Sequence, residues 1–187
     1  MKRHNFLYTK SMTSEKVSLY KIKNFSLEFK FKHLDFYNEI YYLRKIKMFD
    51  LMLFNVRRYI DSNLIKKKLN FSILLTNDSE IKEINLKYRN LDKPTNVLSF
   101  KSMIDKRYYF KNNEHEIHLG EIIISLERIV CESKINNVSF KNHFIHIFLH
   151  AILHILGYDH ETDSERKKME NIEIAILKSL GIKNPHV

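Results

Sequence analysis

The sequence predicts an α+β domain, in which helices pack on a small mixed β-sheet of about four strands. Residues 24–34 alternate Phe and Leu with polar residues, as a half-buried strand does. Residues 71–76, 96–100 and 121–125 are short apolar or β-branched runs, which favour strands. From residue 126 onward the apolar residues have helical spacing. The expected order of elements is β-α-β-α-β-β-α-α-α.

The N-terminal part is expected to hold a tail, the first strand and one long helix. Residues 1–22 are polar and basic without a sustained period, so we expect a mobile tail, followed by a single domain over residues 23–187. Apolar residues recur at mostly helical intervals over residues 38–68, which predicts a helix that is either continuous or broken. The strand over residues 24–34 precedes it.

Capping and helix-breaking residues divide the rest of the chain. Residues 77–80, NDSE, favour the start of a helix that runs to Lys87 or Tyr88, and Pro94 prevents its continuation. The polar segment over residues 101–120 is expected to be a loop, and a candidate mobile flap. Three helices follow, over residues 126–133, 139–156 and 162–180. Gly157 and Gly181 stand where the last two should end.

Composition indicates a cytoplasmic protein. No stretch approaches the roughly 18 uninterrupted apolar residues of a membrane-spanning helix, and the basic N-terminus lacks the apolar segment of a signal peptide. We therefore expect no membrane partner. The single cysteine, Cys131, cannot form an internal disulfide and is expected to be a packing residue.

The net charge of +10 lies entirely in the first 70 residues, which hold 16 Lys and Arg against 6 Asp and Glu, whereas the rest of the chain holds 16 of each. This asymmetry favours a polyanionic partner such as RNA, although a general lysine-rich composition explains it almost as well. The candidate nucleic-acid-binding residues are Arg57, Arg58, Lys66, Lys67 and Lys68. The three lysines also suit a helix C-terminus electrostatically.

The segment HAILHILGYDH, residues 150–160, has the spacing of a metal site. His150 and His154 are four residues apart, so on a helix they share one face. Gly157 allows the chain to reverse, and His160 can then approach the same point. Three imidazoles with one open position are typical of catalytic zinc sites. The cofactor expected from this pattern is one Zn²⁺ ion.

Neighbouring polar residues are candidates to orient these ligands. A carboxylate or a backbone carbonyl would orient the other ring nitrogen of each histidine, and Asp159 and Glu161 are the local candidates. His143 and His146 lie on the same predicted helix, but ligands spread over two turns do not readily converge on one ion. For these two histidines we favour helix packing or a supporting role.

The histidine spacing is also that of the metzincin zinc proteases, H-E-x-x-H-x-x-G-x-x-H. In those enzymes the glutamate is the general base, whereas this chain has Ala151 at that position. Alanine cannot accept a proton from water, so proteolysis by that mechanism is disfavoured.

Four motifs in order give the chain a resemblance to the YbeY family of bacterial rRNA maturation factors. They are INLKYRNLDKPTNVLSF (84–100), LGEIIIS (119–125), HAILHILGYDH (150–160) and MENIEIAILKSLG (169–181). The resemblance covers roughly residues 70–182. The chain differs from the family pattern at Asn96, Glu121 and Ala151.

This resemblance implies a function and a set of site residues. It implies a zinc-dependent single-strand endoribonuclease that acts in ribosomal RNA maturation, including 16S rRNA 3′-end processing, and in ribosome quality control. His150, His154 and His160 would be the zinc ligands, and Arg89 would be the catalytic arginine that stabilises charge on the phosphate. The implied partners are ribosomal RNA and the small ribosomal subunit, with a ribosomal protein or a GTPase as further candidates.

Two other functions stay open from the sequence alone. One is a ribosome assembly factor without catalytic activity, in which zinc stabilises the fold. The other is a metallopeptidase with a general base that the sequence does not reveal. Assays with RNA and with a protein substrate distinguish the three.

Overall fold

A mixed β-sheet organises the chain. The computed structural model describes residues 16–32, 37–103 and 115–185. Within these residues, five strands form one sheet in the order β1-β2-β3-β5-β4. β1/β2 and β4/β5 are antiparallel pairs, and β3 is parallel to both β2 and β5. The bounds are β1 Lys16–Ile22, β2 Phe25–Phe31, β3 Lys68–Thr76, β4 Val97–Lys101 and β5 Glu116–Ser125.

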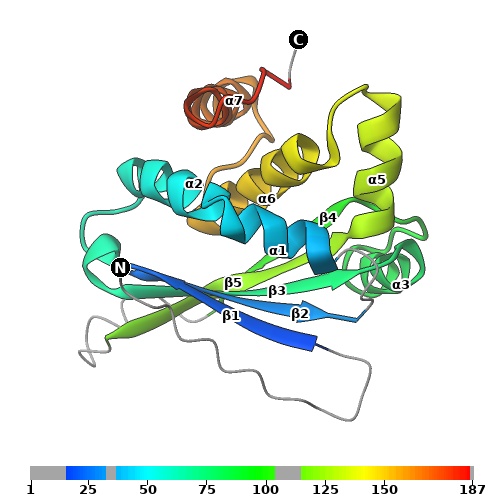
Figure 1. The fold of residues 1–187 in the computed structure, drawn as a ribbon, viewed down its shortest axis with the longest axis horizontal. Helices are drawn as coiled ribbons and strands as arrows, with labels where there is room; N and C mark the ends of the chain where they lie inside the picture. Colours follow the sequence, from blue (N-terminus) through cyan, green and yellow to red (C-terminus); the bar gives the residue numbers. More distant parts are fainter. Residues whose placement is uncertain (1–15, 33–36, 104–114, 186–187) are drawn as a thin grey trace.

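Helices cover the sheet mainly on one face (Figure 1). The described helices are α1 Tyr37–Lys45, α2 Met48–Val56, α3 Asp78–Arg89, α5 Leu126–Ile135, α6 Phe140–Leu156 and α7 Asp163–Ser179, with two short 3₁₀ helices, η1 Arg57–Tyr59 and η2 Leu64–Lys66. α1, α2 and α6 lie on the sheet, and α7 packs outside α6 and α2. α3 uses Ile81 to pack against Leu98 and Ile123 of β4 and β5 in a separate small cluster. The predicted α+β class is confirmed, with one strand more than expected.

Aromatic side chains fasten α6 to the sheet. Phe29 of β2, Phe49 of α2 and Phe148 of α6 have ring centroids 5.5–6.0 Å apart, and Phe144 stacks on Phe148 at 6.0 Å. All four side chains are fully buried. Burying such a ring stabilises the fold by about 1.5–3 kcal/mol. α6 is therefore a rigid support for whatever its exposed residues carry.

β1 was not expected, because the burial of its residues does not follow their hydropathy. Within Lys16–Ile22, Ser18 and Tyr20 are buried while Leu19 is 41% exposed. The buried Ser18 hydroxyl accepts a hydrogen bond from the Arg44 side chain of α1. The prediction of a tail over residues 1–22 is wrong for residues 16–22, and residues 1–15 lie outside the described part of the chain.

The long N-terminal helix predicted over residues 38–68 is broken. α1 ends at Lys45, and Lys47 takes a left-handed conformation with φ 57° before α2 begins. After α2 the chain forms η1 and η2, and Lys68 already belongs to β3. The three predicted basic residues Lys66, Lys67 and Lys68 therefore do not end a helix of regular α type.

β5 begins at Glu116, five residues earlier than expected. Ile117 and Leu119 are buried, so the first half of this strand also faces the core. The pairing with β3 shifts register between Asn70 and Phe71, which marks a bulge beside Gly120. The expected loop over residues 101–120 is thus shorter, and residues 104–114 lie outside the described residues.

The C-terminal helices agree closely with the predicted ranges, because their caps are explicit in the sequence. The Ser139 side chain accepts a hydrogen bond from the Asn142 amide at the start of α6. Thr162 and Glu165 form a capping box at the start of α7. Gly157 ends α6 with φ 99°, a conformation that favours glycine.

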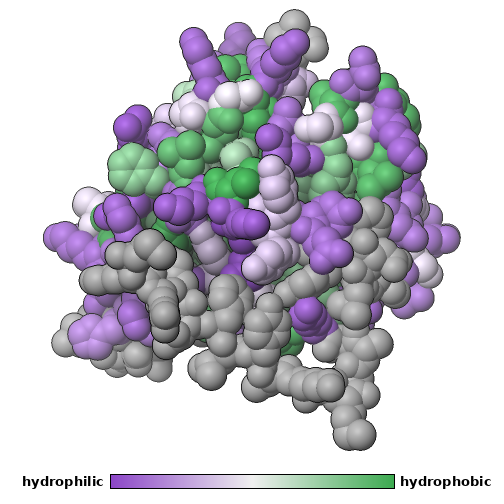
Figure 2. Space-filling model, viewed as in Figure 1, coloured by the Kyte–Doolittle hydropathy of each residue, from purple (hydrophilic) through white to green (hydrophobic). Residues whose placement is uncertain are grey.

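None of the helices in the described part of the chain is both long and apolar enough to cross a bilayer. In Figure 2, apolar residues lie among hydrophilic ones over α2 and α5. Those on α2 include Leu51 and Phe54, which are 44% and 49% exposed.

The packing of α6 gives a stability prediction. Phe148→Ala should lower the free energy of unfolding by about 3–5 kcal/mol, because it opens a cavity between α6 and the sheet. Phe54→Ala removes the same atoms from an exposed site and should cost about 1 kcal/mol or less. Urea denaturation of both variants measures the difference. Equal midpoints for the two variants would contradict this account of the core.

Candidate metal centre

Three histidines converge at the C-terminal end of α6. The helix places His150 and His154 on one face, and the turn at Gly157 brings His160 back toward them. One ring nitrogen from each lies within 4.8 Å of the others, and the Nε2 atoms of His150 and His154 are 3.0 Å apart. Ligands of a tetrahedral zinc ion, at about 2.0–2.1 Å from the metal, lie about 3.3 Å from one another. Small side-chain rotations therefore suffice for all three to share one ion.

A buried carboxylate on α7 holds the first histidine. Glu173 is only 1% exposed, and its Oε1 atom lies 2.8 Å from His150 Nδ1. A hydrogen bond donated from Nδ1 leaves the lone pair of Nε2 directed toward the cluster. Glu173 also approaches His146, with Oε2 3.7 Å from Nε2. The sequence did not single out Glu173 for this role.

The charge states of these groups favour a cation. Burial and the neighbouring charges of His150 and His160 lower the pKa of His154 to about 4, so its imidazole is neutral at neutral pH. Burial raises the pKa of the Glu173 carboxyl, but hydrogen bonds and charge from His146 and His150 outweigh burial and hold that pKa well below its usual range. A neutral imidazole beside an anionic carboxylate is the state that binds a divalent metal.

The two carboxylates predicted from sequence lie at the site in different ways. Asp159 Oδ1 is 3.6 Å from His154 Nδ1, and it also accepts a hydrogen bond from the His160 amide. Glu161 lines the same cleft, but it forms no hydrogen bond or ion pair with the three imidazoles. His143 instead contacts Glu132 of α5 at 2.8 Å. His143 and His146 are both outside the cluster of three.

The histidines lie in a cleft of about 730 Å³ between α6, its following loop and β4. Arg89, the last residue of α3, lines this cleft and is exposed. The buried Asn85 side chain donates to the Lys93 carbonyl and fixes the turn that follows Arg89. Residues distant in sequence, Arg89 and the three histidines, thus share one cavity. An anionic ligand there would meet a guanidinium and the imidazole cluster together.

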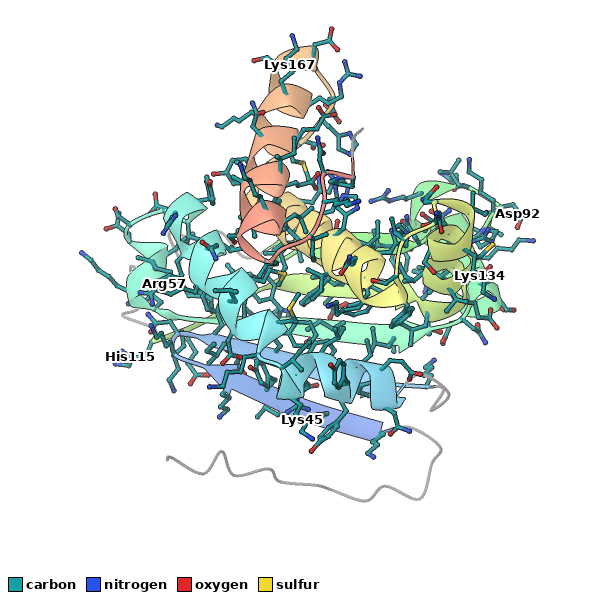
Figure 3. The ribbon with its side chains drawn as sticks, turned by 45° about the horizontal axis from the view of Figure 1, so that its top comes forward. Lys45, Arg57, Asp92, His115, Lys134 and Lys167 are labelled. Carbon is teal, nitrogen blue, oxygen red and sulfur yellow. The ribbon has the colours of Figure 1, made fainter. Side chains whose placement is uncertain are left out.

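The other cationic candidates lie outside this cleft. Arg57, labelled in Figure 3, is half-buried and lines an apolar pocket beside α2. Arg58 and Lys66 are exposed. Lys68 forms an ion pair with Glu116 at 2.6 Å, and this contact lowers the pKa of the Glu116 carboxyl. Lys67 is half-buried.

One hydrogen bond connects η1, which contains Arg57 and Arg58, to the loop that carries His160. The Tyr158 hydroxyl donates to the Tyr59 carbonyl at 3.0 Å, across 99 residues of sequence. η1 therefore lies directly against the loop that carries His160. Arg58 belongs to η1 and does not line the cleft.

The position after the first histidine cannot supply a general base. Ala151 is fully buried in the core side of α6. The described residues therefore present a metal-binding donor set of three imidazoles without the glutamate that a metzincin protease uses. This donor set fits a divalent ion such as zinc with an open position.

One feature of the sequence could have indicated that Glu173 is buried and paired: it is a charged residue within the apolar face of α7. Met169, Ile172, Ile176 and Leu177 are the buried apolar residues of α7, and Glu173 lies among them at helical spacing. A charged residue at such a position is rarely buried without a partner. Its partner was not evident from sequence because His150 is 23 residues away.

The geometry predicts the metal content of variants. Zinc titration of the metal-stripped protein should saturate at one ion, and His154→Ala should abolish that binding. Glu173→Gln should weaken it by about 10–100-fold, because the orienting carboxylate is lost. His118→Ala, on β5 outside the cluster, is the matched control and should bind like the unmodified chain. Full zinc binding by His154→Ala would remove the assignment.

Known proteins match the chain over most of its length. The family described as "Endoribonuclease YbeY" matches residues 42–181. A relative from Neorickettsia sennetsu is 39% identical over 74% of this chain and 90% of its own length, and one from Ehrlichia canis is 42% identical over 78% and 88%. Both carry the name "Endoribonuclease YbeY". A solution structure from Thermotoga maritima aligns at 22% identity with a TM-score of 0.46, over 72% of this chain and 85% of that one. By the match over residues 42–181 and by these relatives, the chain belongs to the YbeY family.

Proposed function

We propose that this chain is a zinc-dependent endoribonuclease that cleaves single-stranded RNA during ribosomal RNA maturation. The observation that carries the proposal is the cluster of His150, His154 and His160 in one cleft with Arg89. Relatives at about 40% identity bear the name of an endoribonuclease. The specific tasks that we propose are 16S rRNA 3′-end processing and ribosome quality control.

The residues in and behind the cleft would have different roles in phosphodiester cleavage. His150, His154 and His160 would hold the metal, which supplies Lewis-acid activation of the phosphate or of the attacking water when bound. Glu173 keeps His150 in the tautomer that presents Nε2. Arg89 would bind two nonbridging oxygens through its paired N–H donors, and its charge is permanent. It therefore stabilises the negative charge that develops on the phosphate.

The same residues make peptide hydrolysis the weaker alternative. Ala151 is buried and carries no proton acceptor. Arg89 is exposed in the cleft, and none of the described carboxylates forms an ion pair with it. An unpaired guanidinium beside a metal site suits a substrate that is anionic at the reacting group.

The proposed partners are ribosomal RNA and the small ribosomal subunit in the cytoplasm, with a ribosomal protein or a GTPase as a further partner. The charge distribution supports an RNA partner, since the net charge of +10 resides in the first 70 residues. The contact between Tyr158 and Tyr59 brings part of that basic region next to the cleft. RNA leaving the cleft on this side would meet Arg58.

One assay separates the three candidate functions. Zinc-loaded protein is incubated with single-stranded RNA, with structured RNA and with casein, alongside His154→Ala and the control His118→Ala. The proposal predicts cleavage of single-stranded RNA by the unmodified chain and by His118→Ala, and loss to background for His154→Ala. RNA binding without cleavage would indicate an assembly factor, and peptide products would indicate a peptidase; either result would overturn the proposal.

Arg89 gives a second prediction. Arg89→Gln should lower kcat for RNA cleavage by about 10²–10³-fold, the usual effect of removing one donor to transition-state charge. Zinc content should not change, because Arg89 is not among the clustered ligands. Lys87→Gln removes an exposed charge two residues earlier on α3 and should leave kcat within about twofold. Equal kcat values for the two variants would contradict the role of Arg89.

A further inference from the structure

Lys101 is a second cation, besides Arg89, in the cleft that contains the three histidines. It is the last residue of β4 and lines the same cavity as Arg89, His150, His154 and His160. It was not selected from the sequence, because it lies at the start of a polar segment that contains several lysines. Its position is set by the sheet rather than by any local motif.

Two of the three glycines in the chain lie against Lys101. Gly120 pairs with it across the β4/β5 ladder, and a Cβ atom on Gly120 would lie only 2.3 Å from the Phe100 carbonyl oxygen and 3.1 Å from the Lys101 Cα atom. Glycine at residue 120 therefore allows the end of β4 to approach β5 closely. This approach fixes where the Lys101 side chain leaves the sheet.

The other glycine locates the ammonium group. The nearest atom to the position that a Cβ of Gly157 would occupy is Lys101 Nζ, at 3.5 Å. Gly157 ends α6 three residues after His154. The Lys101 side chain thus crosses from β4 to the C-terminal end of α6, directly beside the metal loop.

This ammonium group has no counter-ion in the described structure. Other cations are paired, as Lys68 is with Glu116 and Arg128 with Asp78, but none of the described carboxylates forms an ion pair with Lys101. The acidic residues of the cleft are Asp159, which faces His154, and Glu161. An exposed and unpaired ammonium in a cleft is free to bind an anion.

Lys101 and Arg89 reach the cleft from different elements, since Arg89 is the last residue of α3 and Lys101 is the last residue of β4. The chain enters β4 at Val97, eight residues after Arg89, and leaves it at Lys101. Lys101 Nζ lies beside Gly157 at the end of α6, whereas Arg89 belongs to α3, so the two cations come from separate parts of the cleft wall. Two cations on separate elements suit two phosphates of one RNA strand.

We propose that Lys101 binds an RNA phosphate next to the one that is cleaved, and so positions a polynucleotide across the metal centre. The inference rests on the proposed RNA substrate and adds to it the recognition of a second phosphate. The alternative is a structural role, because a cation near the C-terminal end of α6 also interacts favourably with the helix dipole. Lys134, in the last turn of α5 and outside the cleft, is the matched control for that effect. Figure 3 shows Lys134 at the opposite side of the view from Arg57.

Binding of a single-stranded RNA oligonucleotide to metal-free protein in EDTA tests the proposal without cleavage. Fluorescence anisotropy at several salt concentrations gives the slope of log affinity against log salt. Lys101→Ala should reduce the magnitude of this slope by about 0.7, as expected for one lost phosphate contact on a single strand. Affinity at low salt should fall roughly tenfold, whereas Lys101→Arg should stay within about threefold of the unmodified chain.

The control decides between phosphate binding and helix stabilisation. Lys134→Ala removes the same charge and should change neither the slope nor the affinity. If Lys101→Ala matches Lys134→Ala and the unmodified chain in both quantities, the proposal is overturned. Thermal unfolding of the two variants should give similar midpoints, and a much lower midpoint for Lys101→Ala that Lys101→Arg restores and Lys101→Gln does not would assign a structural role instead.

Cleavage kinetics distinguish this inference from the proposed function. Lys101→Ala should raise KM for an RNA oligonucleotide about tenfold while kcat changes less than threefold, because the residue contacts a phosphate that does not react. An equal loss in kcat would overturn the assignment to a neighbouring phosphate. Absence of RNA cleavage by the unmodified chain, with the salt slope still dependent on Lys101, would contradict the proposed function and leave the binding site standing.

Discussion

The hydrogen bond between Glu173 of α7 and His150 of α6 is the interaction on which the candidate site depends. A carboxylate that is 1% exposed is costly unless it is paired, and breaking such a pair typically costs about 3–5 kcal/mol. The pair joins α6 to α7, and it sets which nitrogen of His150 faces the cluster. One contact therefore couples the packing of α7 to the orientation of a candidate metal ligand.

The rest of the cleft is built around this fixed pair. α6 is anchored by Phe144 and Phe148, and Gly157 turns the chain so that His160 returns to the same point. β4 forms the facing wall, with Arg89 before it and Lys101 at its end. Rigid elements thus carry the imidazoles and the cations together, which is the preorganisation that charge stabilisation in a reaction requires.

The sequence allowed the C-terminal half to be predicted well, because its signals are local. The helix caps at Ser139 and Thr162 and the four-residue spacing of the histidines all act within one or two turns. The features that were missed depend on contacts distant in sequence. β1 was missed because it buries Ser18 and exposes Leu19, and Glu173 and Lys101 acquire their roles only when helices and strands assemble.

The central claim is that three imidazoles hold a zinc ion with an open position for the substrate. X-ray absorption spectroscopy at the zinc edge, on protein loaded with one equivalent of zinc, tests it most directly. The account predicts three imidazole nitrogens at about 2.0–2.1 Å and one further light ligand. A sulfur ligand at about 2.3 Å, or a shell of oxygen atoms without the imidazole scattering pattern, would contradict it.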